Sequence, residues 1–498
     1  MSRQRSEPPQ DKLEVRSSRR RFLKGAGAGA LIVGSSSVLP KALATDSVQV
    51  CKTPDCDYDT IVIGGGFAGV TAASELSNAG EKTLLLEARS RLGGLTFTSE
   101  FAGQPIEMGG TWIHWLQPHV WAKMQRYGLG VEESPVTAPS QAVLLSSDGH
   151  RKTYDPMEMM GALAESFEKY CYDASIHFPR PFEPLFSPSV HKLDQVSMLE
   201  RLKQTDLTAD QQDMTSGLGF ALSGIDLDEA GMAGILKSFA CAGWNFTAFM
   251  DTQSHYKIEG GTIALINAMI NDCNAEVSLS SPVESIAQRD NKVLVTIDDG
   301  RTISAASVVI TIPLNTYKNI EFSPALSKHK QRITSTPRQS KGLKVYVHVK
   351  QNLGQVLGLG AHTQPINVIQ TEHYDDHHGT ILVALGGSRD LLDINDDEAV
   401  AEQVKRFFPD VDVLGSAGYD WVYDLYSQGT WPAFRVNEMT KDVPAMQKPE
   451  GRLVFAGGAT ANGWHEWIDG AIESGLRAAR EVKSLQSEAR HEQKSSSA

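Results

Sequence analysis

The sequence predicts an α/β protein in which a Rossmann-like dinucleotide-binding domain is combined with a discontinuous α+β second domain. Three observations predict this class. A strand, a glycine-rich turn and a helix follow one another from residue 58. Residues 156–250 are rich in Met, Leu, Ala and Glu at helical spacing, and an antiparallel meander over residues 283–312 comes after them.

The first predicted strand leads directly into the turn. Residues 58–63 form an apolar run, residues 64–69 read GGGFAG, and residues 70–78 have a helical pattern. A second apolar run, residues 83–86, ends in the acid Glu87. This order of strand, turn, helix, strand and acid is typical of a dinucleotide site.

Each glycine of the turn has a separate expected role. Gly64 permits the tight turn, Gly66 lets the backbone approach a pyrophosphate, and Gly69 lets the helix pack close to the strand. The helix N-terminus offers free N–H groups and a partial positive charge to the phosphates. Glu87 is placed to accept hydrogen bonds from ribose hydroxyls, which excludes a 2′-phosphate but leaves FAD and NAD open.

The later elements are expected from periodicity. We expect helices within residues 156–250 and a disordered, Ser-rich tail over residues 487–498. The strands expected after the first two are residues 283–288, 293–297, 307–312, 345–350 and 380–385.

Composition excludes several classes of protein. The chain has 498 residues and a formal charge of −13 with no basic stripe in its body, which argues against a nucleic-acid partner. No apolar run reaches the roughly 18 to 20 residues that a membrane span needs. Five cysteines in this length exclude a small disulfide-stapled scaffold, and we expect no metal site.

Residues 1–44 differ from the rest of the chain. They hold nine Lys or Arg and three acids, so they carry +6 and the remaining chain carries −19. SRRRFLK at 18–24 resembles a twin-arginine export signal, and the small-x-small triplet at 42–44 follows a weakly apolar stretch. We expect a signal peptide and a periplasmic protein, with a cytoplasmic protein that retains the signal as the alternative. In an oxidising compartment Cys51 and Cys56 are candidates for a disulfide, and two free thiols are equally compatible.

Four segments together resemble the flavin monoamine oxidase family. They are EARSRLGG at 87–94, EMGGTWIHW at 107–115, FAGGAT at 455–460 and GWHEWIDGAIESG at 463–475. The resemblance covers roughly residues 57–486. Three segments, SRLGGLTF, WLQPHVW and PLNTYK, are most similar to those of the bacterial nicotine-pathway amine oxidases.

The resemblance implies FAD as the cofactor and an FAD-binding domain of the amine oxidase type with a substrate domain. No Cys stands next to Trp431 where some family members attach their flavin, and Thr430 is there instead, so we expect non-covalent FAD. The FAD-binding segments are 57–135, 250–335 and 445–486, and the substrate segments are 136–249 and 336–444. The expected cofactor residues are Gly64, Gly66, Gly69, Glu87, Arg89, Gly93, Gly94, Gly110, Thr111, Val283, Gly457 and Ile468.

The resemblance also implies three catalytic side chains. Trp431 and Trp467 match the two aromatic walls that hold an amine over the flavin, and Trp112 is expected beside them in the substrate site. Two indole faces leave a narrow, dry slot that favours the uncharged amine. Lys344 matches the lysine that holds a water against the flavin, and the helix that begins near Gly470 directs its positive end at the ring.

Two departures from the family pattern lie near the expected cofactor. Leu95 stands where an Arg is usual, and Ala459 where an acid is frequent, which leaves FAD affinity and redox tuning open.

The substrate class follows from the resemblance and from what the segments lack. No Arg follows the second Gly-Gly, which argues against an amino-acid oxidase. The expected reaction is oxidation of pseudooxynicotine to an aldehyde and methylamine, because Trp467 stands where the nicotine enzyme has a small polar residue. A nicotine oxidase and a polyamine oxidase are the alternatives, and a non-catalytic flavin-fold binding protein is the alternative from another class. The electron acceptor is oxygen or a small cytochrome-type protein, and a homodimer is left open.

Overall fold

Two separate β-sheets carry the fold. The computed structural model describes residues 56–335, 340–431 and 433–496. The expected signal peptide and Cys51 lie outside the described residues.

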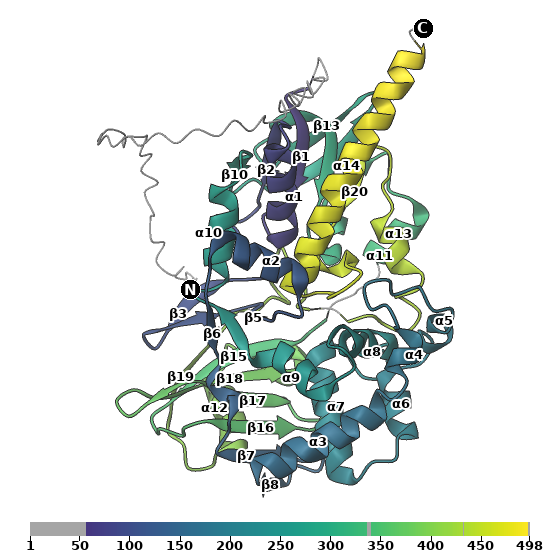
Figure 1. Cartoon of the computed structure of the whole chain (residues 1–498). Coiled ribbons are helices and arrows are strands. Elements are labelled where there is room, and N and C mark those ends of the chain that lie inside the picture. Colours follow the sequence, from purple (N-terminus) through teal and green to yellow (C-terminus); the bar gives the residue numbers. More distant parts are fainter. Residues whose placement is uncertain (1–55, 336–339, 432, 497–498) are drawn as a thin grey trace, which may run out of the picture. The chain divides into compact units, whose positions relative to one another are not determined.

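The larger sheet contains the predicted dinucleotide-binding strands (Figure 1). Its order is β10 (Glu276–Ser278), β2 (Thr83–Leu86), β1 (Tyr58–Ile63), β13 (Thr302–Ile310), β12 (Lys292–Ile297), β11 (Val283–Arg289) and β14 (Glu321–Ser323), with β20 (Leu453–Phe455) also paired to β13. β1 is parallel to both β2 and β13, so an open parallel core with an antiparallel meander at one side is formed. The α/β class is therefore confirmed.

Both faces of this sheet are buried. Val62 packs against α1 (Phe67–Asn78), α10 (Thr262–Asn271) and α14 (Ile468–Ser496), with α2 (Pro118–Tyr127) beside them. Ile61 and Ile63 point to the opposite face and pack with residues such as Tyr317. α11 (Lys328–Ser335) and α13 (Asp442–Gln447) cover that face. Successive side chains of β1 thus pack alternately into the two apolar cores on opposite faces of the sheet.

The second sheet is built from residues 141–154 and 343–418. Its order is β19 (Val413–Gly418), β15 (Leu343–Val349), β18 (Gly379–Gly386), β17 (Val368–Asp375), β16 (Val356–Gly360), β7 (Gln141–Leu145) and β8 (Arg151–Tyr154). α12 (Asp397–Phe407) packs on one face. The strands predicted at 345–350 and 380–385 are confirmed as β15 and β18.

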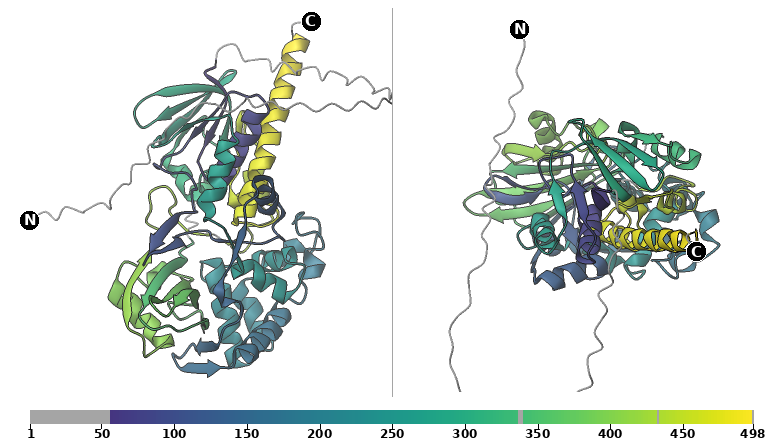
Figure 2. Two further views of the ribbon diagram at one scale, coloured as in Figure 1. Left: turned by 60° about the vertical axis from the view of Figure 1, so that its left-hand side comes forward. Right: turned by 90° about the horizontal axis from the view of Figure 1, so that it is seen from above.

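Helices fill the region predicted to be helical. They are α3 (Pro156–Tyr170), α4 (Ala174–His177), α5 (Val190–Leu193), α6 (Met198–Gln204), α7 (Ala209–Ser223), α8 (Met232–Cys241) and α9 (Phe246–Ser254). Figure 2 shows them, in blue and teal, beside the green strands of the second sheet, and α7 contacts β16 and β17. These helices share one apolar core with residues of β7 and β16 and with residues between Phe434 and Trp464.

Smaller elements connect these parts. They are the hairpin β3 (Thr98–Phe101) and β4 (Gln104–Glu107), the strands β5 (Trp112–Ile113), β6 (Val131–Glu133) and β9 (Tyr256–Ile258), and 3-10 turns at Pro135–Thr137, Leu314–Asn319, Arg389–Leu391 and Gly458–Thr460. The predicted domain boundaries stay a prediction, although the two sheets draw on alternating segments as expected.

Three expected elements differ in extent from the observed ones. α1 begins at Phe67 rather than at residue 70, and β13 spans 302–310 rather than 307–312. The tail expected to be disordered from residue 487 continues α14 as far as Ser496, because Glu, Gln, Lys and Ala in this segment favour a helix that has already begun. Among the described residues, no helix is both long and apolar enough to cross a membrane.

Candidate functional site

The glycine-rich turn after β1 is tightly constrained. Gly64 has φ of +107°, a conformation that favours glycine. A Cβ on Gly69 would lie 1.8 Å from the Gly64 carbonyl oxygen, so α1 reaches its observed approach to β1 only with glycine there. Gly66 is the N-cap of α1, whose first N–H groups have no side-chain cap. The turn from Gly64 to Gly69, together with the free N–H groups at the start of α1, can bind phosphate oxygens, and we call it the cradle.

A second pair of glycines lies against the first turn. Gly93 donates its N–H to the Gly65 carbonyl at 2.9 Å and has φ of +107°. A Cβ on Gly94 would lie 3.1 Å from the Gly66 Cα. The two loops therefore form one glycine-lined wall.

Glu87 is fixed at the end of β2. Its side chain accepts hydrogen bonds from the Gly65 N–H at 2.6 Å and the Arg89 N–H at 2.8 Å, and it is 4 % exposed. The carboxylate thus lies directly beside the cradle, where a ribose could donate to its remaining lone pairs.

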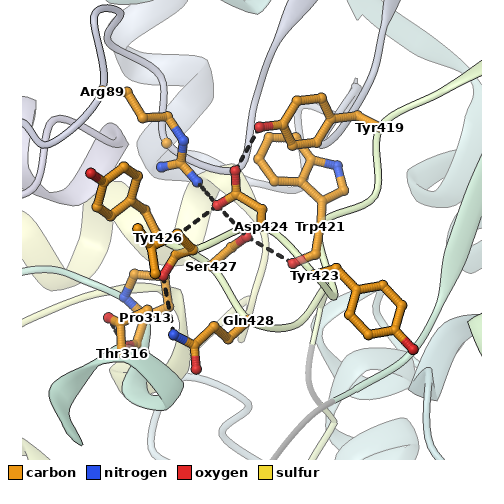
Figure 3. A network of polar contacts seen from close by, with 12 residues as sticks. Arg89, Pro313, Thr316, Tyr419, Trp421, Tyr423, Asp424, Tyr426, Ser427 and Gln428 are labelled. Atoms are coloured by element: carbon orange, nitrogen blue, oxygen red, sulfur yellow. Dashed lines mark hydrogen bonds and ion pairs between the residues drawn. The ribbon is translucent and has the colours of Figure 1, made fainter. Parts of the chain in front are cut away.

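Arg89 joins the cradle to the 419–428 loop (Figure 3). Its guanidinium forms an ion pair with Asp424, which also accepts a hydrogen bond from the Tyr419 hydroxyl at 2.6 Å. These contacts hold the pKa of Asp424 below its usual range, although burial opposes them. The Arg89 guanidinium lies 5.4 Å from the Tyr426 ring centre. Asp424 lies outside the motifs used in the sequence interpretation, so its ion pair with Arg89 was not predicted.

One large cavity of about 700 Å³ begins at the cradle. All the predicted cofactor and catalytic residues line it except Gly69, which lies beneath the turn as its packing role requires. They are Gly64, Gly66, Glu87, Arg89, Gly93, Gly94, Gly110, Thr111, Trp112, Val283, Lys344, Trp431, Gly457, Trp467 and Ile468. Leu95 and Ala459 also border this cavity. The fold thus brings together segments that are up to 400 residues apart.

Lys344 is buried on β15. Its ammonium donates to the Glu107 carbonyl at 2.7 Å, the Gly109 carbonyl at 3.1 Å and the Thr111 hydroxyl at 2.5 Å. Burial lowers the pKa of Lys344 to about 8, although Glu372 and Glu107 act in the opposite direction. All three N–H donors of the ammonium are thus bound by protein oxygens, and Lys344 contributes its positive charge to the cavity wall.

The two tryptophans predicted as walls are each held by contacts with other residues of the protein. Trp431 donates its indole N–H to the Ala221 carbonyl at 3.0 Å and packs over Gly342, where a Cβ would lie 2.7 Å from the ring. Trp467 packs edge to face against Trp464 with ring centres 5.8 Å apart. Held rings can define a slot, because their rotamers are fixed before a ligand arrives.

The N-terminus of α14 borders the cavity at Ile468. The next residue, Asp469, is fully buried and accepts from the His119 N–H at 2.6 Å and the Val120 N–H at 2.9 Å. This carboxylate therefore joins the starts of α2 and α14, and it raises the pKa of His119 against the effect of burial.

The part of the cavity wall contributed by α7, α8, α9, β17 and β18, called here the remote end, is uncharged and largely apolar. Its lining residues from α7, α8, α9, β17 and β18 are Leu218, Gly219, Ala221, Leu222, Ser223, Gly234, Ile235, Ser238, Phe249, Met250, Gln253, Ser254, Val368, Gln370 and Leu385. None of these is an acid or a base, so this end suits an uncharged, largely apolar group.

The sequence interpretation assigned no role to Glu466 or Gln370, which also line the cavity. Glu466 has φ of +62°, and burial raises its pKa to about 8, so it is largely uncharged at neutral pH. Its place between two aromatic residues of the 463–475 motif is a signal that could have found it. Gln370 had no such signal, because one glutamine in an apolar strand is unremarkable. Among the described residues, no group of three or more His, Cys, Asp or Glu could hold a metal ion.

The comparisons agree on one family. The family described as "Flavin containing amine oxidoreductase" matches residues 67–483. Nicotine dehydrogenase of Pseudomonas putida (strain DSM 28022 / S16) is 49 % identical over 470 residues, which cover 94 % of this chain and 97 % of that protein. Pseudooxynicotine dehydrogenase of a Pseudomonas species is 40 % identical over 478 residues, with 94 % and 96 % covered.

Solved structures show the same fold. Putrescine oxidase bound to putrescine superposes with a TM-score of 0.72 at 20 % identity, covering 86 % of this chain and 99 % of that one. Cyclohexylamine oxidase from Brevibacterium oxydans IH-35A has a TM-score of 0.69 at 19 % identity, covering 87 % and 100 %.

Proposed function

The chain belongs to the family of flavin-containing amine oxidoreductases, and we propose that within it this protein oxidises pseudooxynicotine to an aldehyde and methylamine. One observation carries the proposal: Trp431 and Trp467 line the same cavity as the dinucleotide cradle, and its remote end is apolar. FAD is the cofactor, and it accepts a hydride equivalent from the carbon beside the amine nitrogen when bound. The glycine cradle, Glu87 and the start of α14 fit this group.

The residues of the chain have separate duties in this proposal. The glycine turns and the N-terminus of α1 bind the phosphates, and Glu87 accepts from a ribose. Trp431 and Trp467 hold the amine and exclude water, which favours its uncharged form. Lys344, whose three N–H donors are bound by Glu107, Gly109 and Thr111, supplies positive charge at the cavity wall rather than holding the expected water, and the positive end of α14 stabilises negative charge. Thr430, which borders the cavity where a cysteine would be needed, supports non-covalent FAD.

Nicotine is the second candidate substrate. The observation that favours it is the 49 % identity to nicotine dehydrogenase, against 40 % to pseudooxynicotine dehydrogenase. The aromatic Trp467, which gives the slot a second indole wall, favours pseudooxynicotine. The absence of acids from the remote lining residues argues against a polyamine.

Anaerobic mixing of the purified yellow protein with pseudooxynicotine, nicotine and spermidine tests the proposal. We expect rapid bleaching of the flavin band by pseudooxynicotine and none by spermidine. Faster bleaching by nicotine would assign that substrate instead. A protein that binds FAD but is bleached by no amine would support a binding role and overturn the proposal.

Electron transfer out of the protein is a separate proposal. We infer a small basic electron-carrier protein rather than oxygen, because both relatives are named dehydrogenases and the chain outside residues 1–44 carries −19. Reoxidation of the reduced protein by a basic cytochrome should be faster than by oxygen and should slow as salt is added. Reoxidation that is faster with oxygen would overturn this.

We also propose twin-arginine export to the periplasm, on the evidence of residues 18–24. Replacing both Arg19 and Arg20 by Lys should retain the protein in the cytoplasm of a cell-fractionation experiment. Equal periplasmic fractions for both forms would contradict export by this route.

A further inference from the structure

Gln370 is a buried glutamine at the cavity wall. It lies on β17, borders the cavity and is 4 % exposed. Its Nε2 is buried and has no hydrogen-bond partner among the described residues. A buried amide that is not hydrogen-bonded is costly, so such a group in a cavity wall indicates a ligand or water that completes it.

The sheet register places Gln370 away from Lys344. Lys344 pairs with Leu385, and Leu385 pairs with Val368, so these three residues form one row across β15, β18 and β17. Gln370 is two residues further along β17, in the row of Val383. Two strand spacings and one two-residue step separate the Lys344 and Gln370 backbones by roughly 12 Å.

Lys344 and Gln370 line the same cavity, so one elongated ligand can contact both of these residues. Lys344 belongs to the wall where the family resemblance places the flavin ring, and Gln370 lines the cavity one strand and one two-residue step beyond the Lys344–Leu385 pair. Its lining neighbours there include Val368 and Leu385, which offer no side-chain hydrogen bond. An elongated ligand with its amine beside the flavin would therefore extend its other end toward Gln370, whose Nε2 has no partner among the described residues.

We propose that the Gln370 amide donates a hydrogen bond to the ring nitrogen of the substrate's pyridyl group, and that it thereby selects pyridyl amines over phenyl amines of the same shape. This inference rests on the proposed function, since it needs the amine to react at the Lys344 end. An amide can present either its oxygen or its NH₂ by rotation, and the NH₂ matches an aromatic nitrogen that accepts.

The test combines one variant with two substrates. Gln370→Leu removes the donor and keeps the approximate volume. The substrates are pseudooxynicotine and its analogue with phenyl in place of pyridyl, measured by anaerobic stopped-flow reduction of the FAD-loaded protein. We expect Gln370→Leu to weaken pyridyl binding roughly tenfold, with little change in the limiting reduction rate, and to leave phenyl binding unchanged.

Gln364→Leu is the matched control. Gln364 is also buried, at 5 % exposure, but it donates to the Ser146 carbonyl at 2.7 Å and does not line the cavity. This variant should lose thermal stability without changing the ratio of pyridyl to phenyl affinity. FAD content and Tm of both variants report folding.

The outcomes separate the inference from the proposed function. A wild-type protein that neither pseudooxynicotine nor nicotine reduces would refute the proposed function itself. If the wild type is reduced but Gln370→Leu weakens both substrates equally, or neither, only the hydrogen bond to the ring nitrogen is refuted. If Gln370→Leu does not fold, Gln370→Met provides the same comparison, because a thioether cannot donate to the nitrogen.

Discussion

At the scale of single residues, Trp467 is held at the cavity wall by its contacts with neighbouring residues. Its contact with the buried Trp464, which itself donates to the Leu116 carbonyl at 2.9 Å, holds the ring in place at the cavity wall. In the proposed function this wall positions the amine, so its loss should affect the rate rather than cofactor binding.

Trp467→Ala should therefore slow flavin reduction by roughly 10- to 100-fold, which corresponds to about 1.4–2.7 kcal/mol. FAD content should stay unchanged, and Trp467→Phe should retain most of the rate. Stopped-flow absorbance with the amine in excess measures this. An unchanged rate in Trp467→Ala would remove the tryptophan slot from the mechanism.

Lys344 predicts a pH dependence of stability. Burial lowers its folded pKa to about 8 from 10.5. Between pH 8 and 10.5 the unfolded chain holds a proton that the folded chain has lost, so stability rises with pH in this window and is lost as pH falls through 8. The wild type should gain on the order of 2–3 kcal/mol relative to Lys344→Met between pH 8 and 10.5. Urea unfolding of both apoproteins at several pH values measures it, and parallel curves would contradict the prediction.

At the scale of elements, the contact between β1 and α1 leaves no room for a side chain at residue 69. A Cβ at Gly69 would lie 1.8 Å from the Gly64 carbonyl oxygen and 2.8 Å from the Thr311 hydroxyl oxygen. The helix cannot accept this methyl group without moving away from the strand, and the phosphate cradle moves with it.

Gly69→Ala should thus lower the free energy of unfolding by about 1–3 kcal/mol and weaken FAD binding. Gly161→Ala is the control, since Gly161 lies in α3 with open space around its Cβ position and should be neutral or slightly stabilising. Denaturant unfolding and FAD titration measure both. Equal effects of the two variants would show that close packing at Gly69 is not the cause.

Element boundaries show where local patterns are insufficient. β1, β2 and the turn between them were predicted correctly, because a strand buried on both faces and a glycine turn are visible in a short window. β13 begins five residues earlier than expected, since Thr302 to Ala305 pair with β12 and Ala305 also pairs with β1, and pairing is not visible in one strand. α14 continues beyond Gln486 because the Glu, Gln, Lys and Ala residues that follow favour a helix that has already begun.

At the scale of the whole molecule, the cavity connects the two sheets. The cradle comes from the larger sheet, Lys344 and Gln370 come from the second sheet, and the Arg89–Asp424 ion pair joins the cradle to the loop after β19. A ligand that occupies this cavity contacts both parts at once, so its binding energy stabilises them together.

FAD should therefore raise the Tm of the apoprotein in a single transition. At a free FAD concentration of 100 times Kd the gain should be about 2.7 kcal/mol. Differential scanning calorimetry at increasing FAD concentration measures this. Two transitions, of which only one shifts with FAD, would show that the parts unfold independently.

The sequence by itself determined the dinucleotide cradle, the acid that follows β2 and the identity of the family, because these depend on residues within about 30 positions of one another or on motifs that stay in order. Only the tertiary structure decided that Lys344, Trp431 and Trp467 border one cavity with the cradle, and that Gln370, Glu466 and Asp424 belong to its surroundings. The physical reason is that periodicity reports local backbone structure. Which side chains meet across a cavity, and which of them remain without a partner, depends on long-range packing between sheets.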